Sequence, residues 1–347
     1  MPESKIRIQG LTKIFGPKPH TVLNDVKQGM DKQTLLKKYQ HILGLHNVSL
    51  DLQGQQIEVI MGLSGSGKST LLRHINRLIE PTEGTIHVDG DDILAMDGPA
   101  LRHFRQTKTS MVFQNFALLP HKTVLDNVAF GLHTQKKEKH FIKSQAQYWM
   151  ERVGLSGYEK NYPAQLSGGM QQRVGLARAL ACDADILMMD EAFSALDPLI
   201  RSNMQDLLLE LQSELNKTII FITHDLDEAL KIGDRIAIMN EGKLVQHGTP
   251  QDILLRPADQ YVERFVADVN RTRVLLAKSI MVDEKPDNPS PFVTVMEDET
   301  VDTVLHTLLS EDGSYVIVEN AKGRKVGYID KETLAQTVFQ LEAKSAA

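Results

Sequence analysis

The hydrophobic positions along the chain follow two periodicities, which predict strands that alternate with helices. Apolar side chains alternate at Ile6 and Ile8, so residues 1–16 are expected to form a short strand. Helical spacing is found in LLRHINRLI and SNMQDLLLELQSEL. Continuous or nearly continuous apolar runs, typical of strands, are VSLDL, QIEVIMG, ADILMMDEA and TIIFITHD. This alternation predicts an α/β protein with a mainly parallel sheet that is covered on both faces.

Other segments depart from that alternation. Residues 17–45 interrupt the first strands with two prolines and then a helical stretch, DKQTLLKKYQHIL. The apolar side chains of this stretch recur at helical spacing, at Leu35, Leu36, Tyr39, Ile42 and Leu43. Residues 120–180 are expected to be mostly helical, and a hairpin is expected to turn at Asn240–Gly242.

Composition narrows the classes of protein that the chain can belong to. Its 347 residues include 39 Lys plus Arg and 45 Asp plus Glu, giving a net charge of −6. A hydrophobic content of 41% indicates a globular fold, and the single cysteine, Cys182, excludes an internal disulfide or a cysteine metal cluster. The acidic balance argues against general nucleic-acid binding. No apolar run reaches the ~18 residues of a membrane span, and no secretory signal is expected at the N-terminus.

A phosphate-binding loop is the strongest chemical signal. The pattern GxxxxGK[ST] is matched without a gap by Gly62, Leu63, Ser64, Gly65, Ser66, Gly67, Lys68 and Ser69. Glycines allow the backbone amides to approach phosphate oxygens, and the following helix points its positive end at the anion. Lys68 would reach the β- and γ-phosphates and Ser69 would hold Mg²⁺, with Thr70 in the same binding segment.

Acidic and imidazole side chains follow two of the predicted strands. Asp190 would hold Mg²⁺, and Glu191 would act as the general base for hydrolysis. His224 ends the strand TIIFIT, where the carboxyl end of a parallel strand would face the same crevice. Two plainer interpretations remain: Glu191 as a helix N-terminal acid that balances the dipole, and His224 as an ordinary surface or core histidine.

These residues resemble the ATP-binding cassette (ABC) transporter ATPases over roughly residues 5–268. The decisive motif is LSGGMQ, residues 166–171, upstream of ILMMDE. The resemblance implies that Ser167, Gly168, Gly169 and Gln171 contact the γ-phosphate of ATP bound to the opposite subunit. It also implies that Gln114 is a Mg²⁺ ligand that links the site to a transmembrane partner, and that Asp197 lies in the D-loop. Phe15 is similar to the aromatic residue that stacks on adenine, although a core role is the alternative.

A narrower resemblance to the ATPases of glycine betaine, proline and choline importers rests on longer runs. These are MGLSGSGKSTLLRHINRLIEPT, FALLPHKTVLDNVAFG and MMDEAFSALDPLIR, together with the insertion at 17–45. The resemblance implies a peripheral ATPase on the cytoplasmic face of the plasma membrane, which forms an ATP-sandwich dimer beneath a permease. A binding protein would deliver a quaternary amine, proline or histidine. The basic helix of the insertion either touches the membrane or permease or is a solvated face.

The resemblance also implies a domain organisation. A P-loop NTPase with a RecA-like core, a helical subdomain and an antiparallel β-subdomain is expected over 1–268. A linker at 269–291 would lead to one cystathionine-β-synthase (CBS)-like motif at 292–340, acting either as a sensor or as a structural, dimer-stabilising domain. Three other functions stay open: an ABC ATPase that moves no solute, a nucleotide-binding regulator, and an importer ATPase for a sugar or polyamine.

Overall fold

The computed structural model describes residues 4–267, 269–282, 291–310 and 315–335. The chain divides into two compact units, residues 1–247 and 248–347. This division precedes the boundary expected at residue 268. Each unit has its own hydrophobic core, and the first contains all the residues that the sequence assigns to the nucleotide site.

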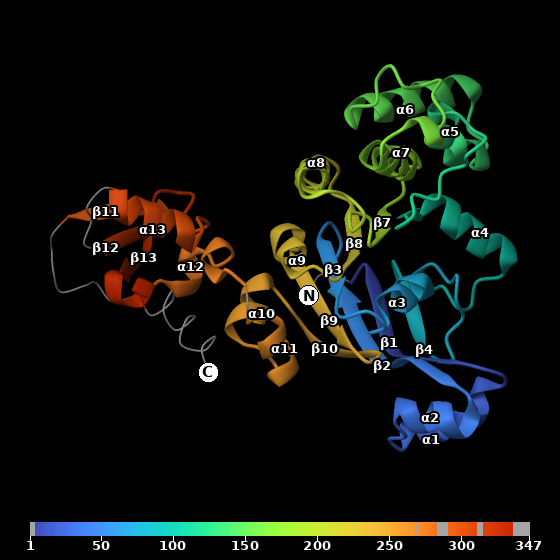
Figure 1. Ribbon diagram of the computed structural model, residues 1–347, viewed down its shortest axis with the longest axis horizontal. Helices are drawn as coiled ribbons and strands as arrows, with labels where there is room; N and C mark the ends of the chain where they lie inside the picture. Colours follow the sequence, from blue (N-terminus) through green and yellow to red (C-terminus); the bar gives the residue numbers. More distant parts are fainter. Residues whose placement is uncertain (1–3, 268, 283–290, 311–314, 336–347) are drawn as a thin grey trace. The chain divides into compact units, whose positions relative to one another are not determined.

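A six-stranded, mainly parallel sheet forms the centre of the first unit (Figure 1). Its strands, in spatial order, are β10 (Lys243–Gly248), β9 (Arg235–Asn240), β3 (Ile57–Met61), β8 (Thr218–Thr223), β7 (Ile186–Asp190) and β6 (Thr109–Val112). Every residue of β3, β7 and β8 is buried, as their continuous apolar runs predict for strands covered on both faces. The pairs β3–β9, β3–β8, β8–β7 and β7–β6 are parallel, so these strands end at one edge.

A second, antiparallel sheet packs against the first across a shared core. Its strands, in spatial order, are β2 (Ile42–Leu52), β1 (Ile6–Phe15), β4 (Glu83–Val88) and β5 (Asp91–Asp92). Helix α3 (Lys68–Ile75) contributes Leu71, Leu72 and Ile75 to that core, beside residues of both sheets. Because α3 is fixed by this packing, the loop at its N-terminus has a defined position.

The predicted helical region is confirmed and forms a group of its own. It consists of α5 (Val124–Thr134), α6 (Lys139–Arg152) and α7 (Gly168–Ala181), with the short helix η2 (Pro163–Gln165) before α7. Figure 1 shows these three helices together, beyond the ends of β7 and β8 and apart from α3. Three further helices of this unit are α4 (Gly98–Thr107), α8 (Pro198–Leu215) and α9 (Leu226–Ile232).

The insertion at 17–45 differs from its prediction. It forms η1 (Pro19–Val22), α1 (Leu23–Lys27) and α2 (Lys32–Tyr39), but the helix expected to run through Leu43 stops at Tyr39. Gln40 closes α2 in the left-handed conformation, with φ 56°, and Ile42 and Leu43 begin β2. Ile42 is 58% exposed whereas Leu43 is buried, which is strand alternation; tertiary pairing with β1 overrides the helical spacing.

The second unit contains a small three-stranded sheet after several short helices. These helices are α10 (Pro250–Leu255), α11 (Gln260–Phe265), η3 (Arg271–Arg273) and α12 (Ala277–Ile280). The strands are β11 (Phe292–Met296), β12 (Tyr315–Glu319) and β13 (Lys325–Asp330), with α13 (Val301–Ser310) after β11. Strand β11 is parallel to β12, and β13 is antiparallel to it.

Part of the expected linker belongs to this second unit. Ala277 is fully buried in the same core as Val293, Val316 and Ile329, so residues 269–282 are not a free connection. The strand–helix–strand–strand order expected for 292–340 is present, and residues 331–335 are helical. Residues 283–290 and 336–340 of the expected linker and motif lie outside the described residues. The CBS-like assignment of this unit stays a prediction.

The antiparallel sheet, the parallel sheet and the helical group confirm the predicted α/β architecture of the cassette. Among the described helices, none has both the length and the apolar character needed to span a bilayer.

Candidate nucleotide-binding site

The residues predicted for phosphate chemistry lie at the carboxyl ends of adjacent parallel strands. Strand β3 leads into the phosphate-binding loop, and β7 ends in Asp190 and Glu191. Strand β8 leads to His224, and β6 to Gln114. Because β3, β8, β7 and β6 are neighbours in this order, all these groups open onto one edge of the sheet, where ligands of parallel α/β proteins bind.

Glycines in the phosphate-binding loop are required by its backbone and by its neighbours. Gly62, Gly65 and Gly67 have positive φ angles of 146°, 77° and 103°. A Cβ on Gly62 would lie 2.1 Å from the carbonyl oxygen of Met239, and one on Gly67 would lie 2.8 Å from that of Gly44. Other residues would therefore be strained and would displace the backbone that cradles phosphate.

The turn of the β9–β10 hairpin packs against the phosphate-binding loop and supports it. The amide of Gly242 donates a hydrogen bond to the carbonyl of Ser66 at 2.9 Å, and the amide of His46 donates to the carbonyl of Gly242 at 2.8 Å. A Cβ on Gly242 would lie 2.7 Å from the carbonyl oxygen of Gly44. The loop is thus held by β2 and by the hairpin before any ligand binds.

Lys68 is the buried cation of the site. Its side chain is 5% exposed, and its Nζ donates to the carbonyls of Gly62 at 2.9 Å and Leu63 at 3.1 Å. Burial lowers the pKa of Lys68, while the nearby Glu191 and Asp190 carboxylates oppose this shift. The ammonium therefore lies inside the loop that would enclose the phosphates, where its charge is little screened.

A hydroxyl and a carboxylate beside Lys68 form a suitable pair for a magnesium ion. Ser69 Oγ donates to Asp190 Oδ1 at 2.7 Å, and Arg73 Nη2 lies 3.7 Å from Asp190 Oδ2. The described residues include no group of three or more His, Cys, Asp or Glu side chains suited to a metal. Mg²⁺ is commonly held by one or two protein oxygens together with substrate phosphates, and this donor set fits that pattern.

Three other side chains of the site lie close to the Glu191 carboxylate. Gln114 Nε2 donates to Glu191 Oε2 at 3.1 Å, His224 Nδ1 lies 3.5 Å from the same oxygen, and Lys68 Nζ lies 3.8 Å from Oε1. The Glu191 backbone is left-handed, with φ 47°, and its carbonyl accepts from Ser194 Oγ at 2.9 Å. A non-glycine residue in this conformation is strained, a feature concentrated at functional sites.

Phe15 is the last residue of β1 and lies near the phosphate-binding loop, from which it is separated by Gly44 of β2. Its ring packs over Gly44, since a Cβ there would be 2.6 Å from a ring carbon, and Gly44 in turn abuts Gly67. Phe15 is 37% exposed, and Lys13 Nζ lies 5.1 Å from its ring centroid. Part of the ring is therefore accessible, and the stacking role of Phe15 stays a prediction.

The LSGGMQ residues do not join this cluster within the chain. Ser167 is exposed and caps α7, accepting from the Met170 amide at 3.4 Å, and Gly168 is exposed. Gly169 abuts Ile200, because a Cβ there would lie 2.7 Å from Ile200 Cγ2. Gln171 Nε2 donates to the Leu166 carbonyl at 3.2 Å. The start of α7 is therefore an accessible surface of the helical group.

Asp197 begins the helix that lies next to this surface. Its carboxylate caps α8, accepting from the Ile200 amide at 3.0 Å. Arg201 Nη2 donates to the carbonyls of Ser194 and Leu196, and its Nη1 donates to Asp225 Oδ2. The hydrogen bonds from Arg201 thus fix the turn at residues 194–197, between Glu191 and α8.

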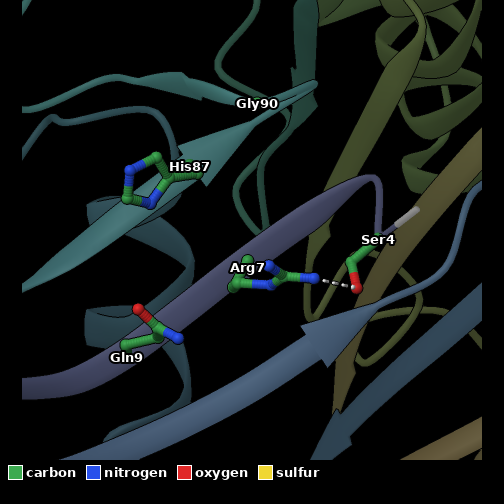
Figure 2. A pocket seen from close by; sticks show the side chains of 5 residues that line it. All are labelled: Ser4, Arg7, Gln9, His87 and Gly90. Atoms are coloured by element: carbon green, nitrogen blue, oxygen red, sulfur yellow. Dashed lines mark hydrogen bonds between the residues drawn. The ribbon is translucent and has the colours of Figure 1, made fainter.

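A separate polar pocket of about 270 Å³ lies on the antiparallel sheet (Figure 2). Ser4, Arg7, Gln9, His87 and Gly90 line it, and the Arg7 guanidinium is bonded to Ser4 and Asp51. It contains none of the residues that the sequence assigns to the nucleotide. We assign it no role.

Three supporting residues were not predicted from the sequence. Gly44 and Gly242 fit against the phosphate-binding loop, and Arg73 faces Asp190. A glycine inside a strand pattern, as at Gly44, indicates a close backbone approach and could have drawn attention to that position. No comparable pattern marks Arg73, since it is one of several basic residues on an amphipathic helix.

Known proteins with similar sequences and folds agree with this geometry. The family described as ABC transporter matches residues 45–194. The glycine betaine transport ATP-binding protein OpuAA of Bacillus subtilis is 54% identical over 277 residues, 80% of this chain and 66% of its own length. The glycine betaine/proline betaine transport system ATP-binding protein ProV of Escherichia coli is 46% identical over 343 residues, 99% of this chain and 85% of its own.

A solved structure supports the same fold. The dimeric, post-hydrolysis ATP-binding cassette MJ0796, bound to ADP and Pi, aligns with a TM-score of 0.60 and 31% identity, covering 71% of this chain and 98% of its own. The shared fold and site, with a long match to ProV, make the chain an ABC-type ATPase that belongs to the ABC transporter family, among the ATP-binding proteins of glycine betaine, proline betaine and choline transport systems.

Proposed function

We propose that the chain is the ATP-hydrolysing subunit of an importer for a quaternary amine or a related osmolyte. The observation that carries this proposal is the convergence of Lys68, Ser69, Asp190, Glu191 and His224 at one sheet edge, in a chain similar to betaine transport ATPases over nearly its full length. Glycine betaine, proline betaine, choline, proline and histidine are the candidate solutes.

The geometry supports a direct displacement at the γ-phosphorus of ATP. Amides of residues 62–69 bind the phosphates, and the Lys68 ammonium turns from the loop carbonyls toward the β- and γ-oxygens. Glu191 accepts a proton from water as the water oxygen bonds to the γ-phosphorus and the bond to the β,γ-bridging oxygen breaks. His224 holds the γ-phosphate, and ADP and phosphate leave.

Magnesium would be held by Ser69, Asp190 and Gln114, which present hydroxyl, carboxylate and amide oxygens at the strand ends. When bound, it would neutralise phosphate charge during the displacement. Gln114 contacts Glu191 in this structure, so its side chain lies within reach of the proposed base.

The exposed start of α7 supports a second copy of the chain as partner. Ser167 and Gly168 offer a hydroxyl and backbone amides at a helix N-terminus, which suits a phosphate. In our proposal, ATP lies between Lys68 of one copy and Ser167 of the other. A transmembrane permease would receive the movement, with a binding protein delivering solute. This assembly would place the chain peripherally on the cytoplasmic face of the plasma membrane.

Residues 292–340 of the second unit would be a single CBS-like motif, for which a structural, dimer-stabilising role and ligand sensing are both retained. The strand order β11–β12–β13 and the intervening α13 support the CBS-like assignment. For the insertion helix α2 we propose a solvated face, since Leu35 is buried whereas Lys37 and Lys38 are exposed.

Uptake measurements test the proposal. The chain would be reconstituted in proteoliposomes with the permease and binding protein encoded beside it, and assayed with betaine, choline, proline and histidine against maltose and spermidine. We expect ATP-dependent uptake of one or more of the amines, and Lys68→Ala should abolish it. Lys217→Ala is the matched control, because Lys217 is paired with Asp183 and precedes β8, away from the carboxyl ends of the strands. Uptake of maltose or spermidine alone would contradict the proposal.

A further inference from the structure

The loop that follows Gln114 contains two successive residues in an unfavourable backbone conformation. Phe116 and Ala117 have φ angles of 57° and 47°, in the left-handed region that non-glycine residues seldom occupy. Such residues persist where surrounding contacts hold them. Phe116 is two residues and Ala117 three residues after Gln114, so whatever holds them also fixes the path of the Gln114 backbone.

One side chain from α7 makes hydrogen bonds to both of these residues. Arg178 Nη1 donates to the carbonyl of Ala117 at 2.7 Å, and its Nη2 donates to that of Phe116 at 2.9 Å. The planar guanidinium presents its donors in a fixed fork, so it can bridge two neighbouring carbonyls as a lysine cannot. Burial lowers the pKa of Arg178, yet a guanidinium remains protonated.

Phe116 also contacts the start of the same helix. Its ring atom Cζ lies 3.9 Å from the position of a Cβ on Gly168, the exposed glycine after Ser167. Its carbonyl oxygen lies 3.8 Å from the position of a Cβ on Gly175, in the middle of α7. The loop therefore follows α7 from its first turn to Arg178.

We propose that Arg178 is a positioning residue for hydrolysis: its fork fixes the strained pair Phe116–Ala117 to α7 and so keeps Gln114 within reach of Glu191. The inference rests on the proposed ATPase function and deepens it. In the structure, where Arg178 makes both hydrogen bonds, Gln114 Nε2 is 3.1 Å from Glu191 Oε2. Without the two Arg178 hydrogen bonds, Phe116 and Ala117 leave the left-handed conformation and Gln114 moves away from Glu191. The phosphate-binding loop keeps its conformation.

Two substitutions on one helix separate this role from general stabilisation. Arg178→Met removes the fork, and Arg173→Met is the matched control. Arg173, also on α7, donates from Nη1 to the Val153 carbonyl at 2.8 Å, a contact within the helical group. We expect Arg178→Met to lower kcat about tenfold with ATP affinity unchanged within about twofold, and Arg173→Met to leave both unchanged.

The dependence on Gln114 is tested in a double-mutant cycle. In a Gln114→Ala background, Arg178→Met should cause no further loss of kcat, because both changes remove the same contact. Ala117→Gly should restore much of the kcat lost in Arg178→Met, because glycine adopts the left-handed conformation without the Arg178 hydrogen bonds. An equal loss in both backgrounds, or no rescue by glycine, would overturn the proposal.

Hydrogen exchange of peptides covering residues 109–124 tests the clamp without reference to hydrolysis. We expect exchange at 114–118 to become at least tenfold faster in Arg178→Met and to stay unchanged in Arg173→Met. Unchanged exchange in Arg178→Met would refute the clamp even if the protein is an active ATPase. A wild-type protein that does not hydrolyse ATP would refute the proposed function, while the exchange data would still decide the clamp.

Discussion

Two helices of the protein begin at glycine-rich turns, and their surroundings differ. At the start of α3, Lys68 is buried with Asp190 and Glu191 beside it. At the start of α7, Ser167 and Gly168 are exposed, and the Ser167 hydroxyl contacts its own helix. Both helix ends carry the partial positive charge that favours phosphate. The first contains the reacting groups, whereas the second offers only additional donors.

In our proposal, each copy of the chain carries two halves of a site that do not meet within it. Figure 1 shows α7 in the helical group and α3 beside β1 and β4 of the same unit, apart from α7 in the view. A phosphate bound to both helix starts would then require two copies, as in the proposal above. The following changes test the two helix starts separately.

The largest effect is expected at the base beside α3. Glu191→Gln keeps the size of the side chain but removes proton acceptance, so turnover should fall by about 10²–10⁴-fold. ATP binding should persist, because the loop and Lys68 are intact. Gel filtration with ATP should then show a trapped dimer. A variant with normal turnover would exclude Glu191 as the base.

A smaller effect is expected at the start of α7. Ser167→Ala and Thr123→Ala each remove an N-cap hydroxyl, from α7 and α5 respectively, and each should cost about 1 kcal/mol of stability. In our account only Ser167 also touches a partner's nucleotide. ATP-dependent dimerisation should therefore weaken about tenfold in Ser167→Ala and remain unchanged in Thr123→Ala. Equal dimerisation by the two variants would remove the distinction between these helix starts.

Phe15 should contribute several-fold to ATP affinity. Replacing it by Ala removes a stacking surface worth about 1 kcal/mol without touching the phosphates. Phe141→Ala is a suitable control, since Phe141 is an exposed ring of α6 that also lies under a lysine, Lys137. Calorimetric titration with ATP should show weaker binding only for Phe15→Ala. A fall in melting temperature at unchanged affinity would favour the core role instead.

The smallest expected effect is a pH dependence of ATP affinity, which arises from Lys68 at the start of α3. Because burial lowers the pKa of Lys68 from its ordinary 10.5, the ammonium loses its proton at a lower pH than an exposed lysine. ATP binding favours the protonated form, so affinity should decline in alkaline solution, starting at a lower pH than the titration of an exposed lysine. Lys68→Arg should bind ATP without this decline, since a guanidinium stays charged. A flat profile for the wild-type protein would contradict this.

The strand-end chemistry was predictable because local sequence determines it. Strands β3, β7 and β8 are short, fully buried apolar runs, and the polar residue after each run must lie at the sheet edge. The sequence therefore predicts that Lys68, Glu191 and His224 lie together, as their distances confirm. The helix capped by Ser167 was predicted through a family resemblance.

What the sequence did not predict depends on contacts between distant segments. The end of α2 at Tyr39 follows from the pairing of β2 with β1, which outweighs a helical spacing at Ile42. The support of the loop by Gly242 joins residues far apart in the chain. The prolines and charges that follow Ala277 predict a linker, whereas the burial of Ala277 depends on β11 and β12.

Disulfide trapping across the two helix starts tests the central claim most directly. Leu63→Cys and Ser167→Cys would be combined in a Cys182→Ser, Glu191→Gln chain, leaving these two thiols, and oxidised with and without Mg²⁺-ATP. We predict covalent dimers that form only with nucleotide, because Cys at 63 of one copy would meet Cys at 167 of the other. A disulfide within single chains, with no covalent dimer, would show that one copy encloses its own phosphate and would contradict the account.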